Sequence, residues 1–212
     1  MAIEIKDKEL KEMFEHGLYF HGHLCPAMPL GLRAGLLALR TLGVGRSQDK
    51  ELMLLAETAE GHAMACFLDG LMMATGCTYG KGNVKKLRYG KLAFTLIDRK
   101  GKRQVRVNVK GEFVLNALKT SPFIAKRKAG VPPQEVEREL AEMAVNEIIN
   151  LPEEEIFNTG EVTPIESKPA KGTFEAHPCE GCGEAVYAKW IRVRDKKFYC
   201  IPCSGYKENK DA

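Results

Sequence analysis

Apolar residues recur along this chain with two different spacings, and each spacing predicts one kind of element. A helical spacing predicts helices over residues 7–18, 26–42, 50–75 and 132–150. An alternating spacing predicts two strands, Lys91–Asp98 and Arg103–Val109, joined by a turn that contains Gly101. The chain therefore combines helices with at least one antiparallel hairpin.

The same patterns predict which faces are buried. Gly31 and Gly35 lie four residues apart in the second helix and leave one face bare, so we expect another segment to pack closely there. In the second hairpin strand, alternation places Arg103 and three valines on one face and polar residues on the other, which we expect to be solvated. The helix over 132–150 has an apolar stripe formed by Val136, Leu140, Met143, Ala144 and Ile148.

The 212 residues suffice for one domain and a small module, and composition divides them into three parts. Residues 1–150 form the expected core domain. Residues 151–176 are rich in Glu, Thr, Pro, Lys and Gly, which predicts a linker with one strand near Ile156–Val162. Residues 177–212 form a cysteine-containing module with a strand expected over Val186–Val193.

The composition indicates a soluble protein of a reducing compartment. Hydrophobic residues make up 44% of the chain and charged residues 28%, as in globular proteins. The N-terminal segment is polar and lacks the apolar core of a signal peptide, and no run is long enough to cross a bilayer. Seven cysteines without a secretion signal favour metal ligands or catalytic thiols over disulfides. We expect a cytoplasmic protein.

The net charge of +4 is small, but it is segregated along the chain. Residues 81–110 carry eleven Lys and Arg and one acidic residue, Asp98, whereas residues 131–161 carry nine Glu and one basic residue, Arg138. The basic block either attracts an anionic ligand or nucleic acid or is the solvated face of the hairpin, and we favour the second interpretation. The acidic block is the outer face of a helix.

Two C-x-x-C knuckles near the C-terminus are the most specific motif. Cys179 and Cys182 form the first, and Cys200 and Cys203 follow after 17 residues. This spacing is typical of a structural Zn²⁺ site with four thiolates, and Gly181 and its neighbours allow backbone N–H groups to point at the sulfurs. Two disulfides or a redox pair are the alternatives. A closed site of four thiolates stabilises a fold and has no open position for chemistry.

A second constellation lies near the N-terminus, where His21, His23 and Cys25 alternate with other residues. In an extended segment these three side chains would point the same way. Pro26 suits the first position of a helix, which would make Cys25 the N-cap. The helix dipole would then lower the pKa of the Cys25 thiol, which suits a metal ligand or a nucleophile equally. Structural packing is the alternative.

A third group lies in the apolar segment that follows. His62, Cys66 and Asp69 are spaced at i, i+4 and i+7, so they share one stripe of a helix. Either His62 or Cys66 alone is explained as core packing, but the three together favour a site. Cys77 follows in a glycine-rich loop, residues 75–83, whose glycines permit a close backbone approach to a ligand.

These pieces together resemble the FmdE-like family, named after the FmdE component of formylmethanofuran dehydrogenase. The resemblance is carried by residues 21–26 (HGHLCP), the glycines of the second helix, Cys66 with Asp69, residues 75–83 (TGCTYGKGN) and Tyr89-Gly90-Lys91. The family usually has Gly after Cys-Pro, where Ala27 stands here. The C-terminal module resembles the DksA/TraR-type zinc finger that is often fused to this family.

The resemblance implies an α+β core domain, with helices packed on a small antiparallel sheet, and a homodimer. It also implies a metal site in the core built from the HGHLC loop and the Cys66 helix. We expect His23, Cys25 and Cys66 as ligands of a second metal ion, Zn²⁺, with His21 or His62 completing the set. Asp69 would orient a ligating histidine or act as a general base.

Three hypotheses for function stay open at this stage. In the first, the core site is catalytic or delivers metal, with Cys25 as ligand or nucleophile and Cys77 as a ligand or a redox partner of Cys25. In the second, the chain is an accessory component of a molybdopterin-type dehydrogenase, such as a molybdenum or tungsten formylmethanofuran dehydrogenase. In the third, the finger binds nucleic acid through basic residues interleaved with aromatic ones, such as Arg192 and Trp190.

Overall fold

The computed structural model describes residues 3–165 and 174–205. The chain divides into two compact units, Met1–Ser167 and Lys168–Ala212, which are described separately below. No helix within the described residues is both long and apolar enough to cross a membrane.

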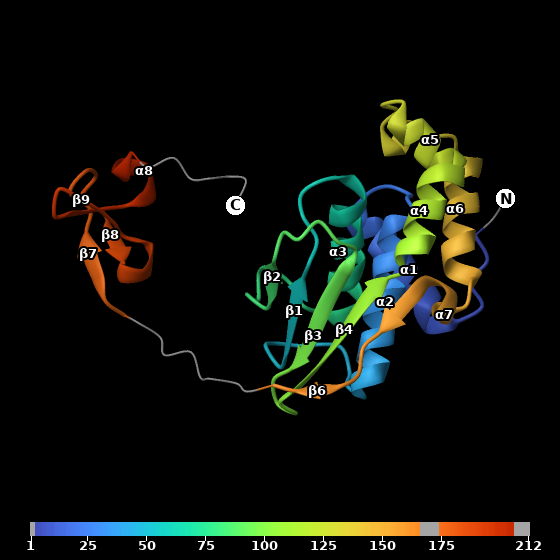
Figure 1. Cartoon of the computed structure of the whole chain (residues 1–212), viewed down its shortest axis with the longest axis horizontal. Helices are drawn as coiled ribbons and strands as arrows, with labels where there is room; N and C mark the ends of the chain where they lie inside the picture. The colour runs from blue at the N-terminus through green and yellow to red at the C-terminus, as the bar shows by residue number, and fades with distance from the viewer. Residues whose placement is uncertain (1–2, 166–173, 206–212) are drawn as a thin grey trace. The chain divides into compact units, whose positions relative to one another are not determined.

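The first unit has the α+β fold that was predicted (Figure 1). Its described residues form a six-stranded sheet in the order β2-β1-β3-β4-β5, with the short β6 paired to the start of β4. β1 pairs in parallel with β2, and the other neighbours are antiparallel. The strands are β1 (Leu52–Ala56), β2 (Val84–Lys86), β3 (Ala93–Asp98), β4 (Arg103–Val109), β5 (Phe157–Thr159) and β6 (Thr163–Pro164).

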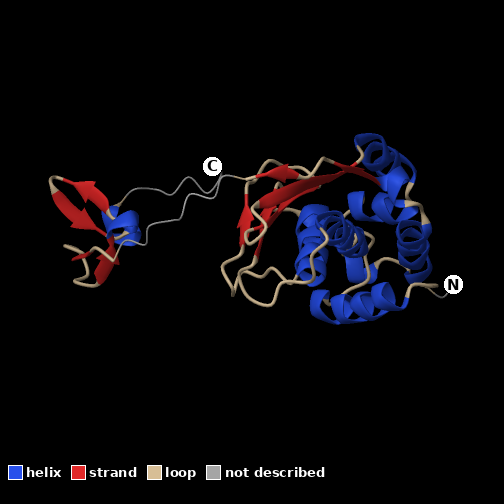
Figure 2. Cartoon of the chain, turned by 90° about the horizontal axis from the view of Figure 1, so that it is seen from below, coloured by secondary structure: helices blue, strands red, loops and turns tan. Residues whose placement is uncertain are grey.

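Helices gather on one side of this sheet, as Figure 2 shows. They are α1 (Lys8–His21), α2 (Ala27–Leu42), α3 (His62–Thr75), α4 (Gly111–Thr120), α5 (Pro122–Lys128), the 3₁₀ turn η1 (Pro133–Glu135), α6 (Arg138–Asn150) and α7 (Glu153–Ile156). α2 lies against β3 and β4 and contacts α1, α3 and α6, so it is the central helix of the unit.

α2 and α3 approach each other so closely that glycine is required at their contact. A Cβ on Gly31 would lie 1.9 Å from the carbonyl oxygen of Phe67, and a Cβ on Gly70 would lie 2.0 Å from that of Met28. Gly35 faces Ala74 in the same way, at 2.5 Å. The close packing that the spacing of Gly31 and Gly35 predicted is therefore present, with α3 as the partner, and it holds two helices in backbone contact without any ligand.

The predicted helix over 50–75 is wrong in its first part. Residues 52–56 form the central strand β1, with alternating burial, and α3 begins only at His62 after Gly61, which has a φ of 124°. A short run of Leu and Met satisfies a helical and a buried-strand pattern equally, so periodicity alone does not separate the two. Pairing on both edges, with β2 and β3, decides for the strand.

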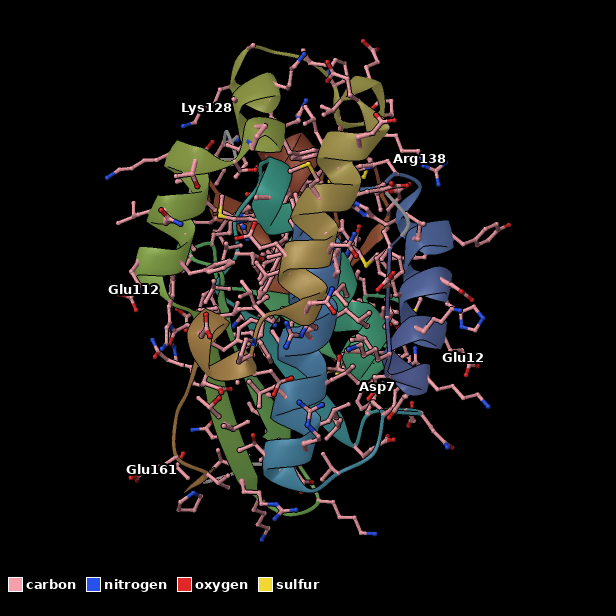
Figure 3. All side chains as sticks on the ribbon, turned by 90° about the vertical axis from the view of Figure 1, so that its right-hand side faces the viewer. Asp7, Glu12, Glu112, Lys128, Arg138 and Glu161 are labelled. Atoms are coloured by element: carbon pink, nitrogen blue, oxygen red, sulfur yellow. The ribbon has the colours of Figure 1, made fainter. Side chains whose placement is uncertain are left out.

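The hairpin forms as predicted, with Asp98 opposite Arg103 and Ala93 opposite Asn108. Val105, Val107 and Val109 are buried, whereas Arg106 on the other face is exposed. The helix expected over 132–150 begins later, at Arg138, and the predicted stripe is partly wrong, because Met143 is 50% exposed. The buried side of α6 consists of Ala141, Glu142, Val145, Ile148 and Ile149. Figure 3 shows Arg138 and Glu112 on the outer surface of α6 and α4.

Part of the expected linker belongs to the core sheet. Phe157 in β5 pairs with Val109, and Thr163 in β6 pairs with Gln104. Ile156 and Phe157 are buried in the main hydrophobic cluster, and the compact unit extends to Ser167. The Glu- and Pro-rich composition of residues 151–165 thus marks short elements on the sheet edge.

The second unit consists of two small hairpins and one helical turn. Its elements are β7 (Ala176–Pro178), β8 (Ala185–Tyr187), the 3₁₀ turn η2 (Ala188–Trp190), β9 (Arg192–Arg194), β10 (Lys197–Tyr199) and α8 (Ile201–Ser204). β7 pairs with β8, and β9 pairs with β10. The single strand expected over Val186–Val193 is therefore two strands interrupted by η2. Among the described residues of this unit, Cys179 and Ser204 alone are buried.

Candidate metal centres

The fold brings four candidate ligands of the core together. His21 is the last residue of α1, Gly22 turns the chain with a φ of 86°, and Cys25 lies just before α2. Cys66 lies in α3, which packs on α2. One ligand atom from each of His21, His23, Cys25 and Cys66 lies within 4.8 Å of all the others. Two imidazoles and two thiols at this separation are suited to one tetrahedral ion.

The route to this arrangement differs from the predicted one. The segment is not extended at His21, because α1 continues to that residue, three residues beyond the predicted end. The N-cap of α2 is Pro26 rather than Cys25. A helix end, a left-handed glycine and a helix start therefore converge on one point, and alternation of side chains plays no part.

Asp69 orients His21. Its Oδ2 lies 2.8 Å from Nδ1 of His21, and Nε2 of the same ring lies 3.4 Å from the sulfur of Cys25. The hydrogen bond to Asp69, followed by one to Cys66, raises the pKa of His21 to about 9. A carboxylate on one ring nitrogen with the other nitrogen directed into a ligand cluster is the usual arrangement around a metal-ligating histidine.

His23 carries a buried nitrogen with no partner. Its Nε2 makes no hydrogen bond within the part of the chain that the structure describes. Burial, and then the charge of His21, lower the pKa of His23, so its ring is neutral near pH 7. A buried neutral imidazole with an unsatisfied lone pair or N–H is costly unless something binds it. The orphaned nitrogen and the donor set both fit a bound metal ion.

Cys25 and Cys66 form a coupled pair of thiols. Their mutual hydrogen bond lowers the pKa of Cys25 and raises that of Cys66. Backbone N–H groups of Met28 and Ala27, in the first turn of α2, lower the pKa of Cys25 further. The predicted effect of the helix start on Cys25 is thus present although Pro26 occupies the cap, and a thiolate forms more readily at Cys25 than at Cys66.

A pocket of about 240 Å³ adjoins this cluster. His23, Cys25 and Cys66 line it together with Phe123, Arg127 and mostly apolar neighbours. Sequence reasoning missed the contribution of α5 to this wall. The signal was present in Ser121-Pro122, because Ser121 caps α5 and Pro122 occupies its first turn, as helix starts prefer.

Cys77 does not join the cluster. It is fully buried in the hydrophobic cluster that includes Leu52 and Leu54, whereas Cys25 belongs to a different one. Burial raises the pKa of the Cys77 thiol. These positions do not support the expected role of Cys77 as a ligand or a redox partner of Cys25. For His62, the other expected ligand, the side chain lies outside the described part of the structure.

The glycine-rich loop that contains Cys77 has a structural role. Asn83 is fully buried, and its amide donates to the backbone oxygens of Asp49 and Leu52 while accepting from the N–H of Thr78. Lys81 donates to the carbonyls of Ser47 and Gln48. These bonds tie residues 78–83 to the segment before β1, so the polar residues of this loop fasten a connection and are not arranged around a ligand.

The four cysteines of the second unit also converge. Their sulfurs lie within 4.8 Å of one another. The sulfur of Cys179 accepts backbone N–H bonds from Gly181 at 3.3 Å and Cys200 at 3.2 Å, and the sulfur of Cys200 accepts one from Cys203 at 3.4 Å. The bond from Cys200 is the largest of several that lower the pKa of Cys179 to about 6. The predicted N–H groups directed at sulfur are therefore present, and the cluster is suited to a metal ion.

Comparison with known proteins now places the chain. The family model described as "FmdE, Molybdenum formylmethanofuran dehydrogenase operon" matches residues 20–158. The chain belongs to the FmdE family. The match covers every member of the core cluster and ends before the four-cysteine unit. The likeness of that unit to a DksA/TraR-type finger stays a prediction.

Two similar proteins extend the comparison. A protein of Archaeoglobus fulgidus, described as a probable S-adenosyl-L-methionine-binding protein, is 34% identical over 199 residues, which is 88% of this chain and 50% of the relative. The chain thus spans about half the length of that relative. The crystal structure of an FmdE-like protein from Syntrophus aciditrophicus, described as related to a tungsten formylmethanofuran dehydrogenase, has a TM-score of 0.59 at 22% identity, covering 97% of each chain. This second likeness shows the fold.

Proposed function

We propose that the core unit binds one Zn²⁺ ion through His21, His23, Cys25 and Cys66 and acts on a small molecule held in the adjoining pocket. The observation that carries the proposal is the convergence of these four ligand atoms within 4.8 Å on the wall of a pocket. Thiolate and imidazole together favour zinc among the common divalent ions that are not redox-active. A bound zinc ion would supply Lewis acidity to a substrate oxygen.

The surroundings of the cluster support a functional ion over a structural one. Structural zinc sites usually hold together segments that would not otherwise pack. Here the helices that present Cys25 and Cys66 already meet through Gly31 and Gly70. The fold therefore does not need an ion at this position, although the ligands are arranged for one.

Other residues of the chain have distinct tasks in this proposal. Asp69 accepts the proton on Nδ1 of His21, which keeps Nε2 of that ring available to the ion. The N–H groups at the start of α2 favour the thiolate form of Cys25. The apolar part of the pocket, including Phe123, excludes water and strengthens electrostatic interactions with whatever is bound there.

Elemental analysis of the intact protein tests the proposal. We expect two zinc ions per chain in the wild type and one in the double variant Cys25→Ala, Cys66→Ala. The matched control is Cys77→Ala, which removes a buried cysteine outside both clusters and should retain two ions. A wild-type protein that holds one ion, and that takes up no second ion when zinc is added, would contradict the proposal.

A further inference from the structure

The pocket beside the core cluster has a second polar feature besides the candidate ligands. Arg127 of α5 lines it, and among the lining residues that the structure describes it is the one with a permanent charge. Its guanidinium donates to the backbone carbonyl of Val131, which fixes where the charge lies. A guanidinium presents a planar fork of donors that matches a carboxylate.

The remaining wall is apolar and comes mainly from the α4–α5 region. Leu118 of α4 and Phe123 and Ile124 of α5 line the pocket, together with small residues such as Ala27 and Ala63. Phe123 is 4% exposed, so its ring is a fixed part of the wall. Such a lining favours an apolar body, and the few polar groups around it set the orientation of a bound molecule.

The volume limits the size of that body. A cavity of about 150 Å³ holds benzene, so the 240 Å³ available here accommodates one ring, or a short branched chain, with one polar group attached. S-adenosyl-L-methionine, which appears in the description of the archaeal relative, joins an adenosine to an amino acid and is much larger than this. The pocket is therefore too small for a nucleoside-containing ligand.

We propose, as an extension of the function above, that this pocket binds a small monocarboxylic acid with an apolar body, and that Arg127 selects for its carboxylate. In this arrangement the apolar body lies against Phe123 and Ile124, and the part of the molecule away from Arg127 lies beside the ligand cluster. Arg127 is then a specificity-determining residue, and the apolar wall supplies affinity without regard to charge.

Ligand titration of the zinc-loaded, full-length protein tests this assignment without any variant. The probes are fluorobenzoate and its neutral match fluorobenzamide, followed by fluorine NMR and calorimetry. We expect fluorobenzoate to bind one site per chain with a Kd of about 1 mM or tighter. We expect the amide, which has the same shape and no charge, to bind about tenfold more weakly or worse.

Two variants of α5 then locate the selection. Arg127→Gln should weaken fluorobenzoate binding by about tenfold or more and leave fluorobenzamide binding within about twofold. Lys126→Gln is the matched control, because Lys126 is the preceding residue, pairs with Glu137 and does not line the pocket. It removes the same charge and should leave both affinities within about twofold. Leu118→Gln should weaken both probes together, since Leu118 is on the apolar wall.

The outcomes separate this inference from the proposed function. If the protein holds its core zinc but binds benzoate and benzamide equally, or neither, the carboxylate assignment is overturned and the metal site stands. If benzoate binds selectively and the Cys25→Ala, Cys66→Ala variant shows no loss of metal, the pocket assignment stands and the metal proposal falls. Displacement of the probe by S-adenosyl-L-methionine at a lower concentration than by unlabelled benzoate would also overturn the assignment.

Discussion

The two ligand clusters of this chain have similar spacing but opposite surroundings. In the core, His21, His23, Cys25 and Cys66 lie on helices that pack against a six-stranded sheet within the described residues. In the second unit, the four cysteines are themselves the centre, because Cys179 and Ser204 are the buried residues among those described there. The distances between ligands show that both can hold an ion. The surroundings show which unit needs the ion in order to fold.

The sulfur–backbone bonds sharpen this difference. Cys179 receives N–H groups from its own knuckle and from Cys200 in the other knuckle, so the bonds link the two halves of the small unit. Cys25 receives its N–H bonds from the next turn of its own chain, in Ala27 and Met28. Charge on the sulfur therefore joins distant segments in the second unit and stays local in the core.

The largest expected effect is the loss of one unit on metal removal. A strong chelator should unfold residues 174–205, because an ion that fills such a site contributes about 10–16 kcal/mol to folding. The core should keep its structure. Hydrogen exchange read by mass spectrometry should show full exchange across β7 to β10 and continued protection of α2 and β1. Protected finger amides without metal, or a core that opens together with the finger, would contradict the comparison.

A single methyl group at the α2–α3 contact should destabilise the core. Gly70→Ala places a Cβ 2.0 Å from the carbonyl oxygen of Met28, and backbone cannot yield as a side chain can, so we expect a loss of about 3 kcal/mol or more. Gly111→Ala is the control, because nothing lies near its added Cβ at the start of α4, and it should be neutral or stabilising by up to about 1 kcal/mol. Urea unfolding followed by circular dichroism measures both.

Removal of the carboxylate behind His21 should weaken one site only. Asp69→Asn should lower zinc affinity at the core by about 10- to 100-fold, because the oriented proton on Nδ1 is no longer held by a charge. The finger should retain its ion. Competition with a colorimetric chelator separates the two sites by affinity, and equal weakening of both would mean that Asp69 acts through general destabilisation.

The smallest effect concerns an ion pair on the sheet. Arg106 hydrogen-bonds lower the pKa of the nearly buried Glu57 from its ordinary 4.5, so the pair stabilises the fold above that value and loses this contribution as pH falls through the lower folded pKa. Glu57→Gln should cost about 1 kcal/mol at pH 7, with or without metal, since Arg106 is partly exposed.

Urea unfolding at pH 7 and at about pH 3 tests this last prediction. The difference between wild type and Glu57→Gln should shrink at the lower pH. Glu12→Gln, at an exposed position of α1 visible in Figure 3, should have no effect at either pH. A difference that persists at low pH would mean that the pair contributes through packing and not through charge.

The sequence predicted the ligands better than the frame around them. His21, His23 and Cys25 are local neighbours, and Cys66 with Asp69 needed only helical spacing, so short-range rules found the group that the structure brings together. Long-range pairing decided what those rules could not. β1 is a strand because β2 and β3 flank it, and β5 joins the sheet because β4 offers an edge.

The pocket wall was beyond the reach of motif reasoning for a different reason. Leu118, Phe123 and Ile124 carry no ligand chemistry, and they lie about fifty residues or more from Cys66 in the sequence. Asn83 was part of a recognised motif, but its task of fastening residues before β1 appears only when those residues are in place. Residues identified by what they touch need the fold, whereas residues identified by what they can ligate do not.

The direct backbone contact at Gly31 and Gly70 has a consequence for ion exchange. Where two helices touch without intervening side chains, there is nothing that can rearrange to widen the gap, so the separation of Cys25 and Cys66 is stiff. A larger thiophilic ion such as cadmium would then have to strain the core, whereas the second unit assembles around whatever ion it meets. The same cell could therefore exchange the ion of the finger and leave the choice made by the core unchanged.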